Sequence, residues 1–86
     1  MKIAFSSHVT DKLHLLAERG FPVTKEQVLD CVKKPDKIDA GYKGRKIAQK
    51  GFDAEHVLRV VYTEEDGIKR IITCYPGRRE RYEDEI

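Results

Sequence analysis

Cysteine, histidine and long apolar runs are scarce in this sequence, and their scarcity argues against several classes of protein. The two cysteines, Cys31 and Cys74, lack the spacing of a metal-binding or redox pair. The three histidines form no zinc motif. No apolar run suggests a signal peptide or a membrane span. We therefore expect a cytoplasmic protein with two buried thiols and without a metal, a cofactor or a membrane contact.

The length and the charge distribution restrict the kind of site that the chain can form. A chain of 86 residues is expected to form one domain, residues 1–86, that buries about 60–65% of its unfolded surface, which favours a surface groove over a large cavity. The net charge is +2, but residues 42–82 carry ten basic against six acidic side chains, whereas residues 1–41 carry seven against six. The second half therefore suits a polyanionic partner.

The first part of the chain predicts a strand followed by two helices. Residues 2–6 alternate weakly, as in a short strand, and Ser6 or Ser7 can cap a helix that stops at Gly20. A second helix begins at Thr24, which forms a capping box with Gln27, and it ends before Pro35. We expect the following apolar residues of the two helices to face the core: Val9, Leu13, Leu16, Ala17, Val28, Leu29, Cys31 and Val32.

The rest of the chain predicts strands. A short strand around Ile38 precedes a turn at residues 41–44, and residues 45–50 form the next strand. Asp66-Gly67 is the strongest turn signal, because both residues tolerate the positive φ of a type I′ hairpin. The expected fold is α+β, with two helices on one face of a twisted antiparallel sheet and the order β-α-α-β-β-β-β.

Side-chain alternation along this hairpin assigns residues to two faces. Counted from the turn, one face is expected to hold Val57, Arg59, Val61, Thr63, Ile68, Arg70, Ile72 and Cys74. The other face is expected to hold Leu58, Val60, Tyr62, Ile71, Thr73 and Tyr75.

Arg59 interrupts an apolar strand, where an unpaired charge is costly to bury. It must therefore reach solvent, a carboxylate or an anionic ligand. Pro76-Gly77 is expected to end the strand and release a tail that carries several arginines and Tyr82. Guanidinium groups match phosphate oxygens and an aromatic ring can stack on a base, so the tail suits RNA. A solvated charged tail is the simpler alternative.

Residues 45–82 resemble the core of the RelE/ParE superfamily of bacterial and archaeal toxins. The resemblance rests on "LRVVY", on "IITCYP" and on the basic R-x-R stretch with its tyrosine. Together with "SSH", "ERG" and the Pro-Asp pair, the whole chain is similar to a small domain family grouped with RelE-like and BrnT-like toxins. The resemblance implies a toxin of a type II toxin–antitoxin system that cleaves mRNA without a metal, often on the ribosome, and that binds a cognate antitoxin.

The resemblance also implies which residues act. Cleavage by a 2′-hydroxyl needs a base, an acid and fixed positive charge at the phosphorane, and arginines suit the third role. The catalytic residues carried over from the family pattern are Lys46, Arg59, Arg79, Arg81 and Tyr82. The cations expected to bind RNA beside them are Arg45, Lys50, Arg70 and Arg78.

The sequence departs from the family pattern in two respects. The chain ends four residues after Tyr82, where many relatives continue into a further helix, and one lysine of the pattern is missing. The second of two paired lysines falls on Ala48, and this leaves the general base open between Lys50, Glu80 and His8. A non-catalytic ParE-like or antitoxin-docking module is therefore an alternative function.

A third interpretation is an RNA binder that does not cleave, with Tyr42, Tyr75 and Tyr82 as stacking residues. The acidic residues 83–85 could shield the basic groove, although a frayed end is the simpler interpretation.

Overall fold

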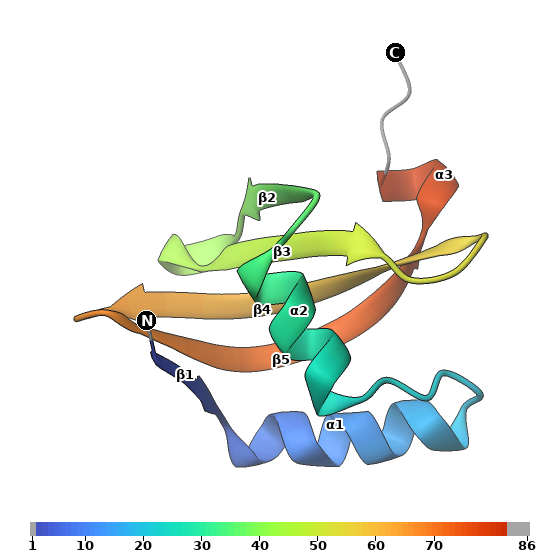
Figure 1. The fold of residues 1–86 in the computed structure, drawn as a ribbon, viewed down its shortest axis with the longest axis horizontal. Coiled ribbons are helices and arrows are strands. Elements are labelled where there is room, and N and C mark those ends of the chain that lie inside the picture. Colours follow the sequence, from blue (N-terminus) through green and yellow to red (C-terminus); the bar gives the residue numbers. More distant parts are fainter. Residues whose placement is uncertain (1, 83–86) are drawn as a thin grey trace.

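The computed structural model describes residues 2–82, and the acidic residues 83–85 lie outside this range. The chain forms the α+β arrangement that the sequence predicts (Figure 1). The elements run in the order β1 (Lys2–Phe5), α1 (Ser7–Glu18), α2 (Lys25–Lys33), β2 (Lys37–Ala40), the 3-10 turn η1 (Tyr42–Gly44), β3 (Lys46–Gly51), β4 (His56–Glu65), β5 (Ile68–Arg78) and α3 (Arg79–Tyr82).

The strands form a mixed sheet in the order β1-β5-β4-β3-β2, with β4 at its centre. The prediction of an antiparallel sheet was wrong for β1, which pairs in parallel with β5 from Lys2 opposite Ile68 to Phe5 opposite Ile71. Side chains alternate in the same way in parallel and antiparallel strands. The sequence pattern therefore carried no information on the direction of this edge strand.

Both helices begin and end where the capping residues predict. Ser6 precedes α1, and its hydroxyl accepts a hydrogen bond from the Val9 N–H at 3.3 Å. Gly20, just after α1, has a φ of +89°, which suits glycine. Thr24 and Gln27 form both bonds of the capping box at the start of α2.

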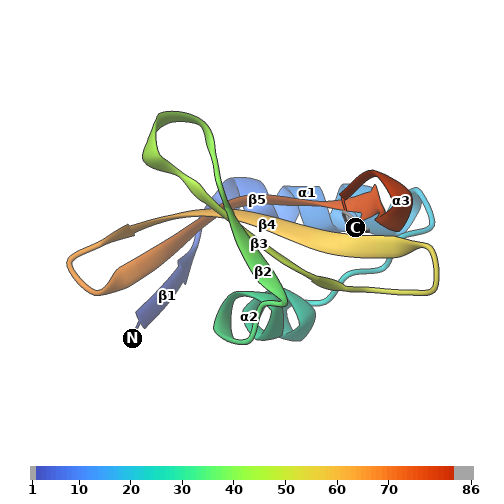
Figure 2. The ribbon, with the colours of Figure 1, turned by 90° about the horizontal axis from the view of Figure 1, so that it is seen from above.

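The two helices contribute to one hydrophobic core. In Figure 1, α2 crosses the sheet and α1 runs along the β5 side, and Figure 2 shows the same arrangement from above. The buried residues of this core are Val9, Leu16, Val23, Val28, Cys31, Val32, Ala48, Leu58, Val60, Tyr62, Ile71 and Cys74. Ala17 is exposed, contrary to prediction, because it lies at the outer margin of the stripe near the end of α1. Leu13 and Leu29 are half-buried.

A β-bulge divides the β4–β5 hairpin into two registers. Glu65 pairs with Ile68 across the predicted two-residue turn, and Tyr62 still pairs with Ile71. Beyond this point the pairing shifts, so that Val61 faces Thr73 and leaves Ile72 as the extra residue.

The shift reverses the predicted faces for the second half of β5. Arg59 pairs with Tyr75, whereas Cys74 pairs with Val60 and lies in the core. Counting from the turn had put Cys74 on the Arg59 face and Tyr75 and Thr73 on the other face. One extra residue inverts every later side chain, because alternation has a period of two.

The prediction for the end of β5 was also wrong. The strand continues through Pro76 and Gly77 to Arg78, and a single helical turn, α3, follows instead of an irregular tail. β1 pairs only with Ile68–Ile71, so β5 is an edge strand at Pro76, where the missing N–H of proline is tolerated. In residues 2–82, no helix is long and apolar enough to cross a lipid bilayer.

Burial should make the stability of the fold sensitive to alkaline pH. Desolvation raises the pKa of Cys31 to about 12 and that of Cys74 to about 11, from a usual value of 9.0. The unfolded chain therefore loses these protons first, and stability falls as pH rises above 9 and through the folded pKa values. Between pH 8 and pH 10, each thiol should lower the free energy of unfolding by about 1 kcal/mol.

Chemical denaturation of the wild type and of Cys31→Ala at both pH values measures this effect. Lysines and tyrosines titrate in both proteins, so the difference between them isolates the thiol. Equal pH dependence in the two proteins would contradict the prediction.

Candidate functional site

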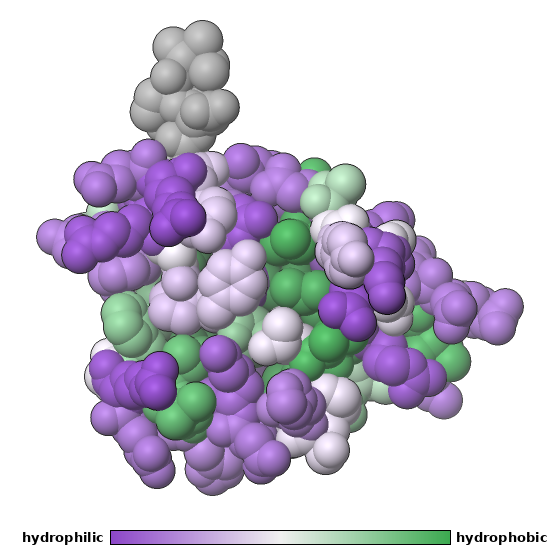
Figure 3. Space-filling view, turned by 180° about the vertical axis from the view of Figure 1, so that it is seen from behind, coloured by the Kyte–Doolittle hydropathy of each residue, from purple (hydrophilic) through white to green (hydrophobic). Residues whose placement is uncertain are grey.

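The face of the sheet opposite the core carries polar side chains in a row across four strands. We call this surface the open face. Lys37 pairs with Gln49, Gln49 pairs with Arg59, and Arg59 pairs with Tyr75, so these side chains stand side by side from β2 to β5. The neighbouring row contains Asp39, Ile47, Val61 and Thr73. Figure 3 shows the molecule from this side, with an apolar centre beside an aromatic ring and a hydrophilic rim.

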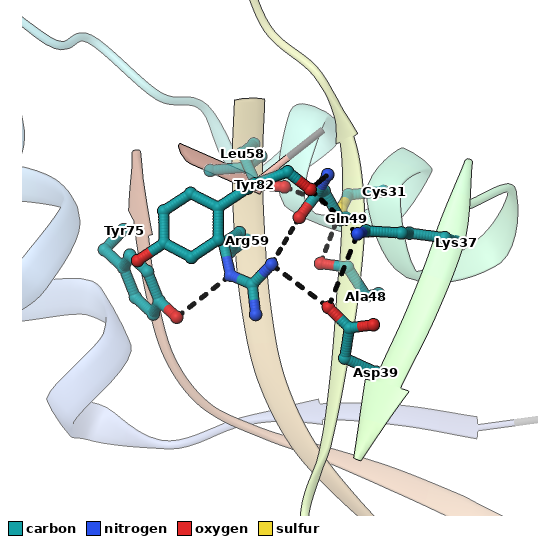
Figure 4. Close-up of polar contacts among 9 residues, drawn as sticks. All are labelled: Cys31, Lys37, Asp39, Ala48, Gln49, Leu58, Arg59, Tyr75 and Tyr82. Atoms are coloured by element: carbon teal, nitrogen blue, oxygen red, sulfur yellow. Dashed lines mark hydrogen bonds and ion pairs between the residues drawn. The ribbon is translucent and has the colours of Figure 1, made fainter. Parts of the chain in front are cut away.

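Arg59 lies at the centre of the open face and is only 5% exposed. Its Nε donates to the Tyr75 hydroxyl at 3.0 Å, and its Nη1 donates to the Asp39 carboxylate at 3.2 Å. Nη1 also donates to the Gln49 side-chain oxygen (Figure 4). The Arg59 charge is therefore paired with a carboxylate, as one of the three sequence-based expectations had it. This pairing offsets the cost of burying the guanidinium.

The third nitrogen of the Arg59 guanidinium is not fully buried. Nη2 makes no hydrogen bond to any residue of 2–82, and Figure 4 draws no contact from it. No buried side-chain nitrogen or oxygen in this range lacks a partner, so Nη2 must retain contact with water. This edge of a rigidly held guanidinium is available to a ligand oxygen.

The turn α3 folds over one end of the open face. The Tyr82 ring lies over the Arg59 guanidinium, with Cζ 4.2 Å from the ring centroid. The same ring packs on Gly77, where an added Cβ would come within 2.4 Å of it. Val57, which pairs with Gly77, is fully buried on this side of the sheet, outside the main core.

Polar contacts hold both ends of α3. The main-chain oxygen of Tyr82 accepts from Lys37 Nζ at 2.8 Å and from Gln49 Nε2 at 3.4 Å. At the other end, the Arg79 N–H donates to the Glu55 oxygen at 2.9 Å, and Arg79 Nε donates to the Asp53 oxygen at 2.8 Å. The strand arginine, the tyrosine and the arginine after β5 therefore lie at one end of the sheet.

The lysines of β3 lie on the other face. Lys46 pairs with Tyr62, a core residue, and its ammonium is 3.5 Å from the Glu64 carboxylate. Lys50 Nζ is 2.9 Å from the Asp30 carboxylate of α2, and this bond raises the pKa of Lys50 and lowers that of Asp30. The structure therefore does not bring Lys46 or Lys50 together with Arg59.

The remaining expected residues are exposed and spread over the surface. Arg81 lies beside the Tyr82 ring, with Cζ 5.8 Å from its centroid. Arg70 pairs with Thr63 near the hairpin turn, on the same face as Arg59 but toward the far end of β4. The other exposed residues are Arg45 after η1, Arg78 at the end of β5, Glu80 in α3, His8 in α1 and Tyr42 in η1.

Three residues of the open face were not identified from the sequence, namely Lys37, Asp39 and Gln49. Each contacts Arg59 or Tyr82 from a strand whose register the sequence does not give. Gln49 offered a weak signal, because a glutamine on the same face as Ile47 in an interior strand needs a polar partner. Asp39 and Lys37 looked like ordinary exposed charges of an edge strand.

Asp53 and His56 form a second polar pair that the sequence did not reveal. His56 Nδ1 is 2.9 Å from the Asp53 carboxylate, and the His56 ring packs edge-on against Phe21. The Glu55 N–H also donates to Asp53, and this bond is the main cause of the lowered pKa of Asp53. The pair closes the β3–β4 turn and has a structural role.

The chain was compared with protein family models, with curated proteins and with solved structures, and none of the three comparisons gave a match. The RelE-like resemblance therefore stays a prediction. Among residues 2–82, no group of histidine, cysteine, aspartate or glutamate side chains is arranged to hold a metal ion.

Removal of the central guanidinium should destabilise the protein. Arg59→Ala leaves Gln49 and Asp39 without their shared donor and removes the cation under Tyr82, so the free energy of unfolding should fall by about 2–3 kcal/mol. Arg70→Ala is the matched control, since Arg70 is an exposed arginine on the same face and should cost less than about 0.5 kcal/mol. Urea denaturation measures both, and similar losses would show that the Arg59 contacts contribute little.

Proposed function

We propose that this chain is a RelE-like toxin that binds single-stranded mRNA on its open face, with Arg59 at the centre of the site. The observation that carries the proposal is the fixed guanidinium, which is held by three strands and has one edge toward solvent beside a tyrosine ring. The two N–H groups of Nη2 can donate to phosphate oxygens, and the flat faces of a guanidinium and of a tyrosine ring can stack on unpaired bases. These are the two contacts on which recognition of single-stranded RNA commonly depends.

The charge around Arg59 adds support. Lys37 stands two strands away in the same row, and Arg81 lies beside Tyr82. Both side chains are positioned to attract the phosphates on either side of the one at Arg59. The bound carboxylate of Asp39 partly neutralises Arg59, so we expect moderate affinity that falls as salt increases.

Cleavage has weaker support than binding. In the expected reaction the 2′-oxygen attacks the phosphorus, a base takes its proton, and the 5′-oxygen leaves with a proton from an acid. Arg59 suits the charge that gathers on the phosphorane. Lys46, which the resemblance assigns to the site, and Lys50, a candidate for the general base, face the helix side and pair with carboxylates. Binding and cleavage therefore need separate tests.

A non-catalytic protein-binding module is the second candidate, and a different observation favours it. The row beside Arg59 contains the half-buried apolar residues Ile47 and Val61, with the half-buried Thr73 next to them. An apolar centre with a polar rim is typical of protein interfaces, and an antitoxin could cover it.

Two lysine substitutions on opposite faces test RNA binding. Lys37→Ala should weaken binding of a fluorescent single-stranded RNA by about three- to tenfold at low salt, because one phosphate contact is lost. Lys46→Ala removes the same charge from the helix side and should leave the affinity unchanged. Fluorescence anisotropy across a salt series measures both. Equal effects would show that the open face is not the site.

The same proteins test cleavage. Incubation with RNA, in the presence and absence of ribosomes, followed by mapping of new RNA ends, should show products for the wild type and for Lys46→Ala if the open face cleaves RNA. Absence of RNA binding at every salt concentration, combined with tight binding to a purified partner protein, would favour the protein-binding module.

A further inference from the structure

Tyr82 makes two contacts that a bound nucleotide would also make. Its ring lies over the Arg59 guanidinium at 4.2 Å, and its Cδ2 and Cε2 atoms lie closest to the backbone at Gly77. Its main-chain oxygen accepts from Lys37 and Gln49 on the neighbouring strands. A planar ring and an acceptor oxygen from one residue are thus held side by side on the open face (Figure 4).

We propose that Tyr82 occupies the position of a nucleotide, and that RNA binds this site by displacing it. The base would stack on Arg59, and a phosphate oxygen would take the place of the Tyr82 carbonyl at Lys37 and Gln49. This inference rests on the proposed RNA binding. It also differs from the sequence-based expectation, in which Tyr82 contributes to the site instead of covering it.

The donors at this position suit an anion better than the oxygen they now hold. The Lys37 ammonium is 2.8 Å from a neutral main-chain carbonyl and, at the longer distance of 3.9 Å, also pairs with the Asp39 carboxylate. A charge-assisted hydrogen bond to a phosphate oxygen is roughly twice as strong as one between neutral groups, and a full negative charge adds attraction to the ammonium. A phosphate therefore competes well with the Tyr82 carbonyl for these donors.

Gly77 gives the ring position its shape. An ideal Cβ at this residue would lie 2.4 Å from Cε2 and 2.5 Å from Cδ2 of Tyr82, so only glycine lets a flat ring reach the backbone. The backbone of Gly77 does not need positive φ, because only Gly20, Gly44 and Gly67 have it among the described glycines. The structural use of glycine here is to make room for a ring, and a base has the same flat shape.

Displacement of Tyr82 should cost little. α3 is a single turn of four residues, too short to be a stable helix without its contacts to the sheet. Arg79 fixes its first residue through Glu55 and Asp53, so the chain can pivot after Arg79 while β5 keeps its pairing. Arg81 precedes Tyr82 in α3 and would move with it. Its long side chain would still reach the bound phosphates.

Substitutions that remove or expel the ring test the proposal. Tyr82→Ala deletes the ring and should tighten binding of a fluorescent single-stranded oligouridylate by about three- to tenfold. Gly77→Ala places a methyl group where either the tyrosine ring or a base would lie, so it should not share this gain in affinity. Gly51→Ala is the matched control, because its Cβ would meet only the flexible Arg79 side chain, at 2.7 Å from Nη2. This control should bind like the wild type.

A resonance at Gly77 gives a second readout. One Hα of this glycine points at the Tyr82 ring and should be shifted by the ring current, and Tyr82→Ala should remove the shift. Titration of the wild type with uridine 5′-monophosphate should change this resonance, whereas inorganic phosphate alone should change it less because no base replaces the ring.

The outcomes separate the two proposals. If RNA binds the wild type but Tyr82→Ala binds it more weakly or equally, Tyr82 does not cover the site and the inference fails while the proposed function stands. If neither the wild type nor Tyr82→Ala binds RNA, both fail. RNA binding by Tyr82→Ala that is tighter than that of the wild type, or that appears only in this variant, supports both.

Discussion

The buried charge of Arg59 must be compensated by hydrogen-bond acceptors, and the arrangement of the open face depends on this requirement. A guanidinium that is 5% exposed within a strand needs hydrogen-bond acceptors in place of water. Three other strands of the sheet each supply one, from Asp39, Gln49 and Tyr75. A slip of one residue in any of these strands would turn its acceptor to the core side. The same interaction therefore fixes the sheet register and builds the candidate site.

The β-bulge at Ile72 makes this arrangement compatible with the core. On the turn side of the bulge, Tyr62 and Ile71 pair on the core face, and on its other side Val60 and Cys74 do so. Without the extra residue, Tyr75 would point into the core and Cys74 would face Arg59. One inserted residue thus gives β5 an apolar inner face along its length and a tyrosine next to the guanidinium.

The electrostatics of the chain divide between the two faces. On the helix side, Lys46 and Lys50 pair with Glu64 and Asp30, which are exposed or half-exposed carboxylates that stabilise the protein little. On the open face the paired charge is nearly buried, and its one solvent-facing edge is fixed in direction. The candidate site therefore depends on the geometry of one guanidinium more than on the number of cations.

The sequence by itself determined the local structure. The capping residues at Ser6 and Thr24, the stop at Gly20, the Asp66-Gly67 turn and the presence of each strand depend on backbone preferences of neighbouring residues, and these were predicted correctly. It also indicated that Arg59 must reach solvent, a carboxylate or an anionic ligand. Only the tertiary structure decided that the Asp39 carboxylate lies beside it.

Four further features were decided in the same way: the parallel pairing of β1, the bulge at Ile72, the continuation of β5 into α3 and the side of the sheet that Lys46 faces. Each depends on pairing between segments distant in sequence. Alternation within a strand is identical for every register and direction, so residue pattern alone cannot distinguish them.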